Sequence, residues 1–486
     1  MYNRRPAAAA LSLALVAALS VGCQVGEPGP APLRPTPTTT TGAQAPPDSS
    51  PIVPTQSSAG DPYVPGNGNG GYDVRHYSLK LKIVPSDAKK SLDAVATIKA
   101  HAQREMAEFN LDLTGLDVSQ VKVNGRKADF DHEGSELVVQ PSATVAGGSD
   151  FTVTVAYSGT PRAVNDPILG QYGWIETPDG VAVACQPSGA HTWFPGNDHP
   201  SDKATFDLAL TVPQNLTAVA NGESGPASTA NGLTTTKWTV EQPMATYLAM
   251  IAVGDFRVKE GVTPGGIPIM VAVDSSVRTP SIDDFYQAKA KITDEWVKLF
   301  GRYPFGSTGG VIDNAAVSFA LETQSRSIYG DFDPSETIIA HELAHQWFGD
   351  SISVTRWQDI WLNEGFASYA EWIWGERMGG QSLQSRFDSL YQETPPSSWQ
   401  VLTGDPGRER LFDSFAVYDR GAMTLHALRA KMGDDEFFSL LRRWAEDHRY
   451  GNATTEQFVD LAESVSGQEL SSFFQAWLYE PVRPPR

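Results

Sequence analysis

The sequence of 486 residues predicts a multidomain α+β protein, in which an antiparallel β domain is followed by a mainly helical domain. Two observations support this prediction. Between about residues 70 and 260, stretches such as YSLKLKIV and FTVTVAY alternate apolar and polar residues, which is typical of strands with one buried face. After about residue 265, apolar residues recur at helical spacing, as in PSIDDFYQAKAKITDEWVKLF.

The N-terminal region indicates export. Two arginines precede an apolar run from Ala7 to Val21, which is too short and too rich in alanine for a membrane span and predicts a signal peptide over residues 1–23. The run ends at Cys23 in LSVGC, which resembles a bacterial lipobox, although Ser20 stands where that motif has Leu. We therefore expect a lipoprotein that Cys23 anchors to the outer side of the cell membrane. Simple secretion is the alternative.

Changes in composition predict the remaining boundaries. Residues 24–68 are rich in Pro, Thr, Ser and Gly and have too little apolar content to fold, so we expect a disordered tether. Residues 69–261 form the predicted β domain, in which Asn124-Gly125 predicts a hairpin. Residues 262–486 form the predicted helical domain, whose first helix is expected to end at Gly301.

Charge and cysteine content exclude two classes of interaction. The formal net charge is −20, and an acidic chain repels phosphate backbones, so we expect no nucleic-acid partner. The chain has two cysteines, Cys23 and Cys185, and acylation of Cys23 leaves none to pair with Cys185. We interpret Cys185 as a buried structural residue rather than a nucleophile.

The stretch HELAHQWFGD, from His341 to Asp350, carries two histidines at helical spacing. In the longer segment DPSETIIAHELAHQWFGD, Asp333 suits the N-cap, Pro334 the first helical position and Gly349 the end of the helix. The spacing then places both imidazoles on one face, where they reach one metal ion. A helix with two unremarkable surface histidines is the alternative interpretation.

A third ligand favours the metal site over that alternative. A catalytic zinc site needs three protein ligands and an open position for water. Glu364 follows His345 within the next apolar helical pattern, WLNEGFASYAEWIWGERMGG, and completes a set with His341. Glu342 projects about 100° away from His341 around the helix axis, so it reaches a water on the metal without binding the metal. We therefore predict a zinc site with Glu342 as general base.

HELAHQWFGD followed by WLNEGFA resembles the gluzincin aminopeptidases, the family of membrane alanyl aminopeptidase and leukotriene hydrolase. The resemblance covers about residues 69–480 and includes GNGGYDVRHYSLKL, WFPGNDHPSDKATF and YLAMIAVGDF in the order of the family. It implies a thermolysin-like zinc peptidase domain after the β domain and one zinc ion held by His341, His345 and Glu364. It also implies Glu342 as general base and peptide substrates outside the cell, which lose their N-terminal residues.

The resemblance also implies roles for residues outside the metal site. Tyr418 in VYDRGAMTLHALR matches the tyrosine that stabilises the oxyanion, with Arg420 in place of the usual Lys. Glu322 in VSFALETQSR matches the glutamate that binds the free α-amine, although the Gly, Met and Asn of the family motif Gly-Ala-Met-Glu-Asn are replaced. Gln186 in ACQPSGA resembles a second amine anchor, and a buried Gln at a strand end is the alternative.

Three further expectations concern the function as a whole. The chain ends at WLYEPVRPPR, so the resemblance implies a site without the large C-terminal helical domain of many members. One alternative function is a zinc endopeptidase or a non-peptide hydrolase that uses the same site. Another is a non-catalytic lipoprotein binding module, which predicts loss of catalytic residues, whereas all five of the proposed ligand, base and oxyanion residues are present.

Overall fold

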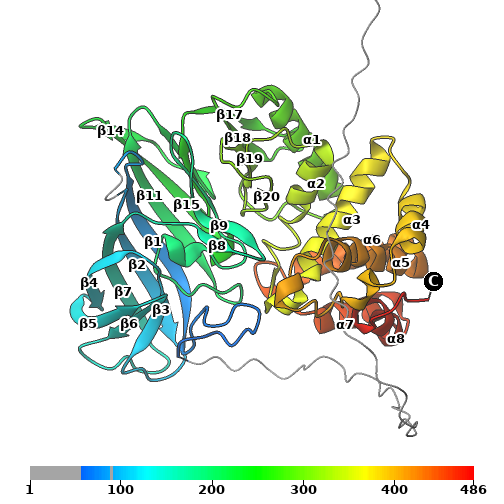
Figure 1. Cartoon of the computed structure of the whole chain (residues 1–486), viewed down its shortest axis with the longest axis horizontal. Helices are drawn as coiled ribbons and strands as arrows, with labels where there is room; N and C mark the ends of the chain where they lie inside the picture. The colour runs from blue at the N-terminus through cyan, green and yellow to red at the C-terminus, as the bar shows by residue number, and fades with distance from the viewer. Residues whose placement is uncertain (1–55, 88–90, 486) are drawn as a thin grey trace, which may run out of the picture. The chain divides into compact units, whose positions relative to one another are not determined.

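The computed structural model describes residues 56–87 and 91–485, which belong to one compact unit. Within this unit, the strands of the first sheet gather on one side and the helices on the other (Figure 1). The predicted signal peptide, Cys23 and the first part of the predicted tether lie outside the described residues.

The first sheet confirms the predicted β domain and contains eleven of the described strands, in the order β13-β15-β11-β1-β2-β7-β4-β5-β6-β3 with β14 beside β15. Asn124 and Gly125 join β4 to β5 with positive φ angles of 51° and 76°, which confirms the hairpin. The strands are β1 (Tyr72–Ile83), β2 (Leu92–Ala102), β3 (Phe109–Asp112), β4 (Asp117–Val123), β5 (Arg126–Glu133), β6 (Glu136–Gln140), β7 (Asp150–Gly159), β11 (Lys203–Pro213), β13 (Glu223–Ser224), β14 (Ser228–Ala230) and β15 (Leu233–Ala245).

The β domain is not wholly antiparallel. Strand β1 pairs with β11 in parallel, although β2 to β10 lie between these two strands in the sequence. A second sheet of five described strands has the order β12-β16-β10-β9-β8. Its strands are β8 (Val164–Asp166), β9 (Gly170–Glu176), β10 (Val181–Ala184), β12 (Thr217–Ala220) and β16 (Ile251–Gly254).

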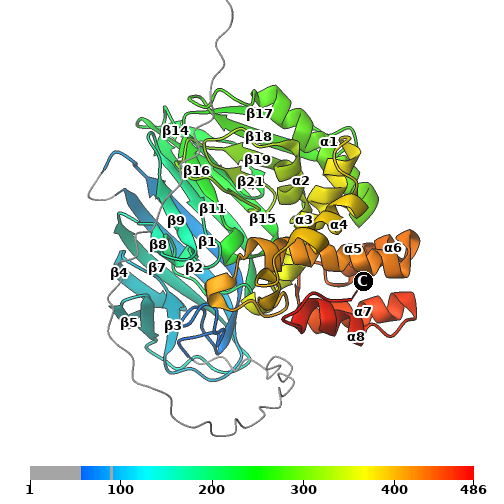
Figure 2. The ribbon, with the colours of Figure 1, turned by 45° about the vertical axis from the view of Figure 1, so that its right-hand side comes forward.

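The second domain begins with a sheet rather than with a helix, and this corrects the expected boundary at residue 262. The third sheet has the order β17-β18-β19-β21-β20 and packs against α1, beside α2 (Figure 2). Residues 256–261, which we assigned to the β domain, pair with β18 and therefore belong to the second domain. The strands are β17 (Phe256–Val262), β18 (Pro268–Asp274), β19 (Thr308–Ile312), β20 (Ala320–Leu321) and β21 (Ser327–Tyr329).

The remaining elements of the second domain are mainly helical, as the sequence predicts. Helix α1 has Ser281 as its N-cap and ends at Gly301, whose φ of 95° stops it. The helices are α1 (Ile282–Phe300), α2 (Glu336–Ala344), α3 (Trp361–Arg377), α4 (Leu383–Glu393), α5 (Arg420–Met432), α6 (Asp434–Asp447), α7 (Thr455–Ser466) and α8 (Ser471–Phe474). Two short strands, β22 (Ser353–Val354) and β23 (Asn452–Ala453), pair in parallel.

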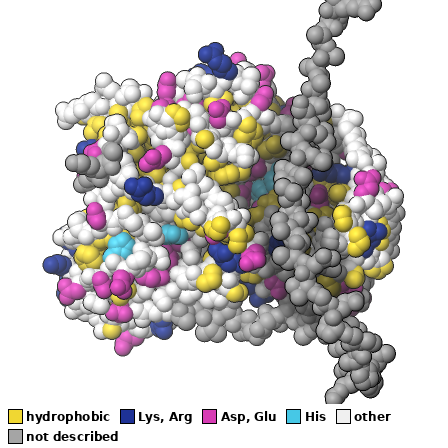
Figure 3. Space-filling model, in the orientation of Figure 1, with side chains coloured by type: hydrophobic (Ala, Val, Ile, Leu, Met, Phe, Trp, Pro, Cys, Tyr) yellow, Lys and Arg dark blue, Asp and Glu magenta, His cyan; other side chains and the backbone are white. Residues whose placement is uncertain are grey.

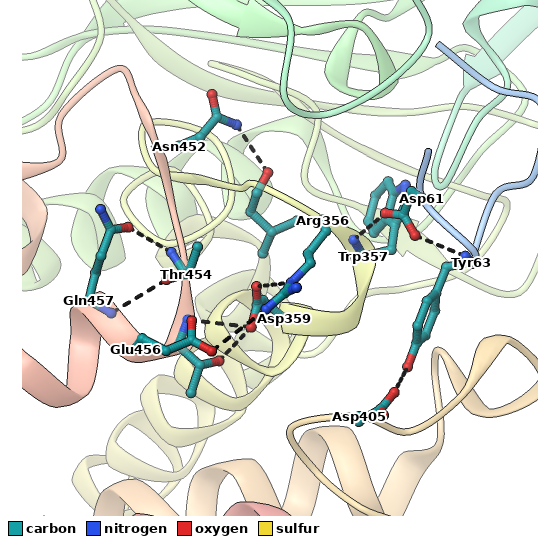
Figure 4. Close-up of polar contacts among 12 residues, drawn as sticks. Asp61, Tyr63, Arg356, Trp357, Asp359, Asp405, Asn452, Thr454, Glu456 and Gln457 are labelled. Carbon is teal, nitrogen blue, oxygen red and sulfur yellow. Dashed lines mark hydrogen bonds and ion pairs between the residues drawn. The ribbon is translucent and has the colours of Figure 1, made fainter. Parts of the chain in front are cut away.

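The predicted tether ends earlier than residue 68. Residues 56–67, which we call the strap, are part of the folded unit because Tyr63 and Val64 are buried and the Asp61 carboxylate is hydrogen-bonded. Figure 4 shows Asp61 beside Trp357, and Tyr63 beside Asp405. The contacts of these residues are mainly polar, so the low apolar content of the segment did not predict them.

The described residues contain no helix that could span a membrane, and the face drawn in Figure 3 carries both basic and acidic side chains. None of the helices in residues 56–87 and 91–485 has the length and apolar content that a bilayer-spanning segment needs. On the face drawn in Figure 3, Lys and Arg side chains are scattered among acidic ones. This distribution agrees with the net charge of −20.

Helices α3 and α5 cross at a pair of glycines. A Cβ atom added to Gly365 would lie 2.9 Å from Gly421 Cα, and one added to Gly421 would lie 2.8 Å from Gly365 Cα. Real Cβ atoms do not approach backbone so closely, so the crossing requires glycine on both helices. Gly365 lies in the motif WLNEGFA and Gly421 in the motif DRGAM, so the crossing positions these two motifs relative to each other.

We predict that Gly365→Ala destabilises the protein by about 1–3 kcal/mol, because the added methyl group forces the two helices apart. Gly375→Ala in the same helix is the matched control, since its Cβ would meet only Thr337 Cγ2, at 4.0 Å. That change should be neutral or stabilise the helix by up to about 1 kcal/mol. Denaturant unfolding of both variants measures the difference, and equal stabilities would contradict the account of the crossing.

Candidate metal centre

Helix α2 carries the two histidines but begins later than the sequence suggests. Its N-cap is Ser335, whose hydroxyl accepts from Ile338 N at 3.3 Å, rather than Asp333 with Pro334 at the first position. The helix also ends before the expected stop at Gly349. His345 is its C-cap and keeps helical dihedral angles, φ −57° and ψ −26°.

The structure brings the three predicted ligands together. Their donor atoms lie within 4.8 Å of one another. Glu364 Oε2 is 3.4 Å from His341 Nε2 and 3.3 Å from His345 Nε2. His345 and Glu364 are buried, and the His341 side chain keeps 12% of its surface exposed, so the centre opens toward solvent on the His341 side.

The donor set fits a zinc ion. Loss of solvation raises the pKa of Glu364, but the charge of His345 and hydrogen bonds with both imidazoles outweigh it and lower the pKa to about 2. Glu364 therefore faces the ring nitrogens as an ionised carboxylate. Two imidazoles and one carboxylate are the ligands found in many catalytic zinc sites, with a fourth position left for water.

Glu342 lies beside this donor set and within a second acidic group. Glu322, Glu342 and His345 also offer atoms within 4.8 Å of one another. Burial raises the pKa of the Glu342 carboxyl, although the charges of His341 and His345 oppose this effect. A carboxylate with a raised pKa beside a metal-bound water suits a general base.

Tyr418 lies in a π-helical segment, η6 (Ser414–Asp419), directly before α5. Its ring stacks on that of His341, with centroids 6.0 Å apart and an interplanar angle of 15°. Loss of solvation and the facing carboxylates of Glu364 and Glu322 hold the pKa of Tyr418 well above its usual value. The hydroxyl therefore stays protonated and available as a donor. π-Helical turns are rare and often occur at functional sites.

The two expected amine anchors contact each other. Gln186 follows β10, Glu322 follows β20, and Gln186 Nε2 donates to Glu322 Oε1 at 2.7 Å. Burial raises the pKa of Glu322 to about 7, a shift that His345 opposes and Glu364 reinforces. The structure thus places a carboxylate and an amide from different domains next to the metal ligands.

Sequence reasoning missed three residues that position this site. Glu371 Oε2 lies 3.6 Å from His341 Nδ1, and Phe348 O lies 3.0 Å from His345 Nδ1, so both rings have a partner on the nitrogen that faces away from Glu364. Gln346 donates to the carbonyl of Glu322 at 3.0 Å. Glu371 was detectable, because it lies two helical turns after Glu364 on the same face of α3.

Two family models match the chain. Residues 74–248 match the Peptidase M1 N-terminal domain, and residues 316–477 match the Peptidase family M1 domain. The first match covers most of the first two sheets. The second begins before Glu322 and includes all of the metal-centre residues described above on α2, α3 and η6.

Curated relatives and solved structures agree with these matches. Aminopeptidase N of Lactobacillus helveticus is 25% identical over 85% of this chain and 51% of its own length. Leucyl aminopeptidase of Saccharolobus solfataricus is 26% identical over 77% of this chain and 50% of its own length. The chain therefore spans about half the length of these relatives.

A crystal structure of an M1 zinc metallopeptidase from Deinococcus radiodurans superposes with a TM-score of 0.79 and 29% identity. The match covers 88% of this chain and 98% of the crystallised one. A variant of the same enzyme bound to the substrate Tyr-Ser-Ala gives a TM-score of 0.79 at 28% identity. The two matched domains, in this order and with the metal-ligand cluster between α2 and α3, show that the chain belongs to peptidase family M1.

Proposed function

We propose that this chain is a zinc aminopeptidase that removes N-terminal residues from peptides. The observation that carries the proposal is the hydrogen-bonded pair Gln186–Glu322 beside the cluster of His341, His345 and Glu364. A metal-ligand cluster alone suits any metallopeptidase. A buried carboxylate next to it supplies a charge that recognises the ammonium group of a free N-terminus.

In this proposal, His341, His345 and Glu364 hold one zinc ion. Bound zinc lowers the pKa of its water toward 7 and polarises the scissile carbonyl. Glu371 and the Phe348 carbonyl orient the two imidazoles through their outward nitrogens, which raises the basicity of the rings as ligands. These contacts hold the donor atoms in place before the metal arrives.

The proton transfers belong to Glu342 and Tyr418. Glu342 takes a proton from the attacking water and passes it to the leaving amine, and its raised pKa suits both steps. Tyr418, stacked on His341, donates its hydroxyl proton in a hydrogen bond to the oxyanion that forms on the substrate carbonyl.

The names of the relatives support peptides with a free N-terminus as substrates. The two relatives described above are named as aminopeptidases, and the similar metallopeptidase structure holds Tyr-Ser-Ala. In this chain, Glu322 and Gln186 would bind the α-ammonium group, which fixes the N-terminal residue next to the metal. An internal peptide bond offers no such group and would leave Glu322 with a neutral partner, Gln186, in place of a cation.

We further propose that the protein is exported and acts outside the cell. The apolar run of residues 7–21 and the LSVGC sequence at Cys23 support a signal peptide and lipidation. Residues 24–55 would then separate the folded unit from the membrane. Secretion without a lipid anchor is the alternative, and metabolic labelling with a fatty acid distinguishes the two.

Replacing Glu342 tests the proton-transfer role. Glu342→Gln should retain zinc but lower kcat by about 10²- to 10⁴-fold, because only the base is lost. Metal analysis and peptide hydrolysis measure the two properties, with Glu336→Gln at the start of the same helix as the control. Full activity in zinc-loaded Glu342→Gln would show that another residue is the base.

Replacing Glu322 tests recognition of the N-terminus. Hydrogen bonds to charged groups contribute about 1.5–3 kcal/mol, so Glu322→Gln should lower kcat/KM for a free tripeptide by roughly tenfold to hundredfold. The N-acetylated tripeptide should be a poor substrate for both proteins. Equal cleavage of the free and acetylated peptides by the wild type would instead identify an endopeptidase.

Replacing Glu371 tests the support of the metal ligands. Glu371→Gln should weaken zinc affinity by about 10- to 100-fold, because the carboxylate beside His341 Nδ1 is lost. Competition with a chelator measures the affinity. Glu376→Gln, also on α3, is the matched control, since Glu376 accepts from Leu383 N rather than from a histidine. Unchanged affinity in Glu371→Gln would exclude the proposed support.

A further inference from the structure

The strap, residues 56–67, contacts both domains through polar groups. Asp61 is 1% exposed and its carboxylate has three partners. Oδ1 accepts from Tyr63 N at 2.9 Å, and Oδ2 accepts from Trp357 N at 2.8 Å and lies 3.2 Å from His199 Nε2. One carboxylate therefore joins the strap, the N-terminal β domain at His199 and the second domain at Trp357.

The backbone that Asp61 holds leads directly to a metal ligand. Trp357 begins the short helical turn η3 (Trp357–Asp359), and Ile360 follows as the N-cap of α3 without a side-chain cap. Glu364 lies in the first turn of α3, where its N–H donates to the Ile360 carbonyl at 3.1 Å. No side chain caps this helix, so the groups that hold η3 act together with the packing of Gly365 against Gly421 to set where its first turn lies.

The other end of η3 is also fixed. Asp359 Oδ1 accepts from Thr455 Oγ1 of α7 at 2.7 Å, and Arg356 lies 3.3 Å from the second Asp359 oxygen (Figure 4). The Trp357 ring packs edge-on against Tyr247, with centroids 5.0 Å apart. From the side of the N-terminal domain, η3 is therefore held by the hydrogen bond to Asp61 and by the ring contact with Tyr247.

Tyr63 holds the segment that leads to Tyr418. It is buried, and its hydroxyl donates to Asp405 Oδ1 at 2.5 Å (Figure 4). The same hydroxyl accepts from Gly407 N at 2.8 Å. The next residue, Arg408, binds Asp166 of β8 at 2.8 Å. The loop 405–408 is therefore tied to the strap and to the β domain just before the π-helical segment η6.

We propose that Asp61 and Tyr63 are positioning residues, which hold the start of α3 and the loop before η6 so that Glu364 and Tyr418 converge on one metal. Hydrogen bonds are directional, so they fix the position of a segment more narrowly than apolar contacts of the same area. The proposal rests on the proposed function only where turnover is the measured property. The expected effect on zinc affinity does not depend on the substrate.

The test uses the full chain with Asp61→Asn and Tyr63→Phe. Asp61→Asn should weaken zinc affinity by roughly threefold or more, because it removes the charge from the hydrogen bond that holds the Trp357 backbone before Glu364. Tyr63→Phe should leave zinc affinity within twofold and lower kcat by roughly threefold or more at unchanged KM. In a Tyr418→Phe background, Tyr63→Phe should cause no further loss of kcat, because its effect acts through Tyr418.

The control is Tyr286→Phe on α1, which removes a hydroxyl that donates to the Val262 carbonyl, outside the strap. It should change neither zinc affinity nor kcat, whatever its effect on Tm. The proposal is overturned if the strap variants lower Tm alone, or if the losses from Tyr63→Phe and Tyr418→Phe multiply. If the wild type showed no turnover, the proposed function would be wrong. The zinc affinity of Asp61→Asn would still test the role of the strap.

Discussion

The metal centre depends on the close crossing of α3 and α5 at Gly365 and Gly421. Gly365 directly follows Glu364, and Gly421 lies three residues after Tyr418. Because neither glycine has a Cβ, the helix backbones approach to a distance that any larger residue would prevent. The crossing therefore brings a ligand on one helix and a tyrosine before the other to the same pair of histidines. Packing of this kind is rigid and fixes geometry to within fractions of an ångström.

The metal centre also requires that the charges of its buried carboxylates be stabilised. Glu322, Glu342 and Glu364 are all buried within one site, and isolated buried carboxylates are strongly unfavourable. Gln186 donates a hydrogen bond to Glu322, and the imidazoles of His341 and His345 face Glu364, so two of the three carboxylates have polar partners from other segments. Gln186 comes from the N-terminal β domain and Glu322 from the second domain, so this contact between the domains lies within the site.

Much of this arrangement was predictable from local sequence. The spacing of His341 and His345 and the helical pattern around Glu364 follow from backbone periodicity, and the Asn124-Gly125 pair predicts the hairpin through its turn preference. Three features were not predictable in this way. The parallel pairing of β1 with β11 joins strands far apart in sequence, so no local pattern encodes it. Helix α2 begins after Ser335 because its hydroxyl, and not the Asp333 carboxylate, reaches the first free N–H groups. The strap has few apolar residues, and its hydrogen bonds reach groups far along the sequence, 296 residues away at Trp357 and 342 residues away at Asp405.

An anomalous difference map at the zinc absorption edge, from crystals of the wild-type chain with zinc, tests the central claim most directly. We predict a single peak bounded by His341 Nε2, His345 Nε2 and the Glu364 carboxylate, with Glu342 outside the coordination sphere. The described residues offer a second possible set, Glu322, Glu342 and His345. A peak bounded by that set would remove both the proposed base and the proposed amine anchor, and it would contradict the account of the site.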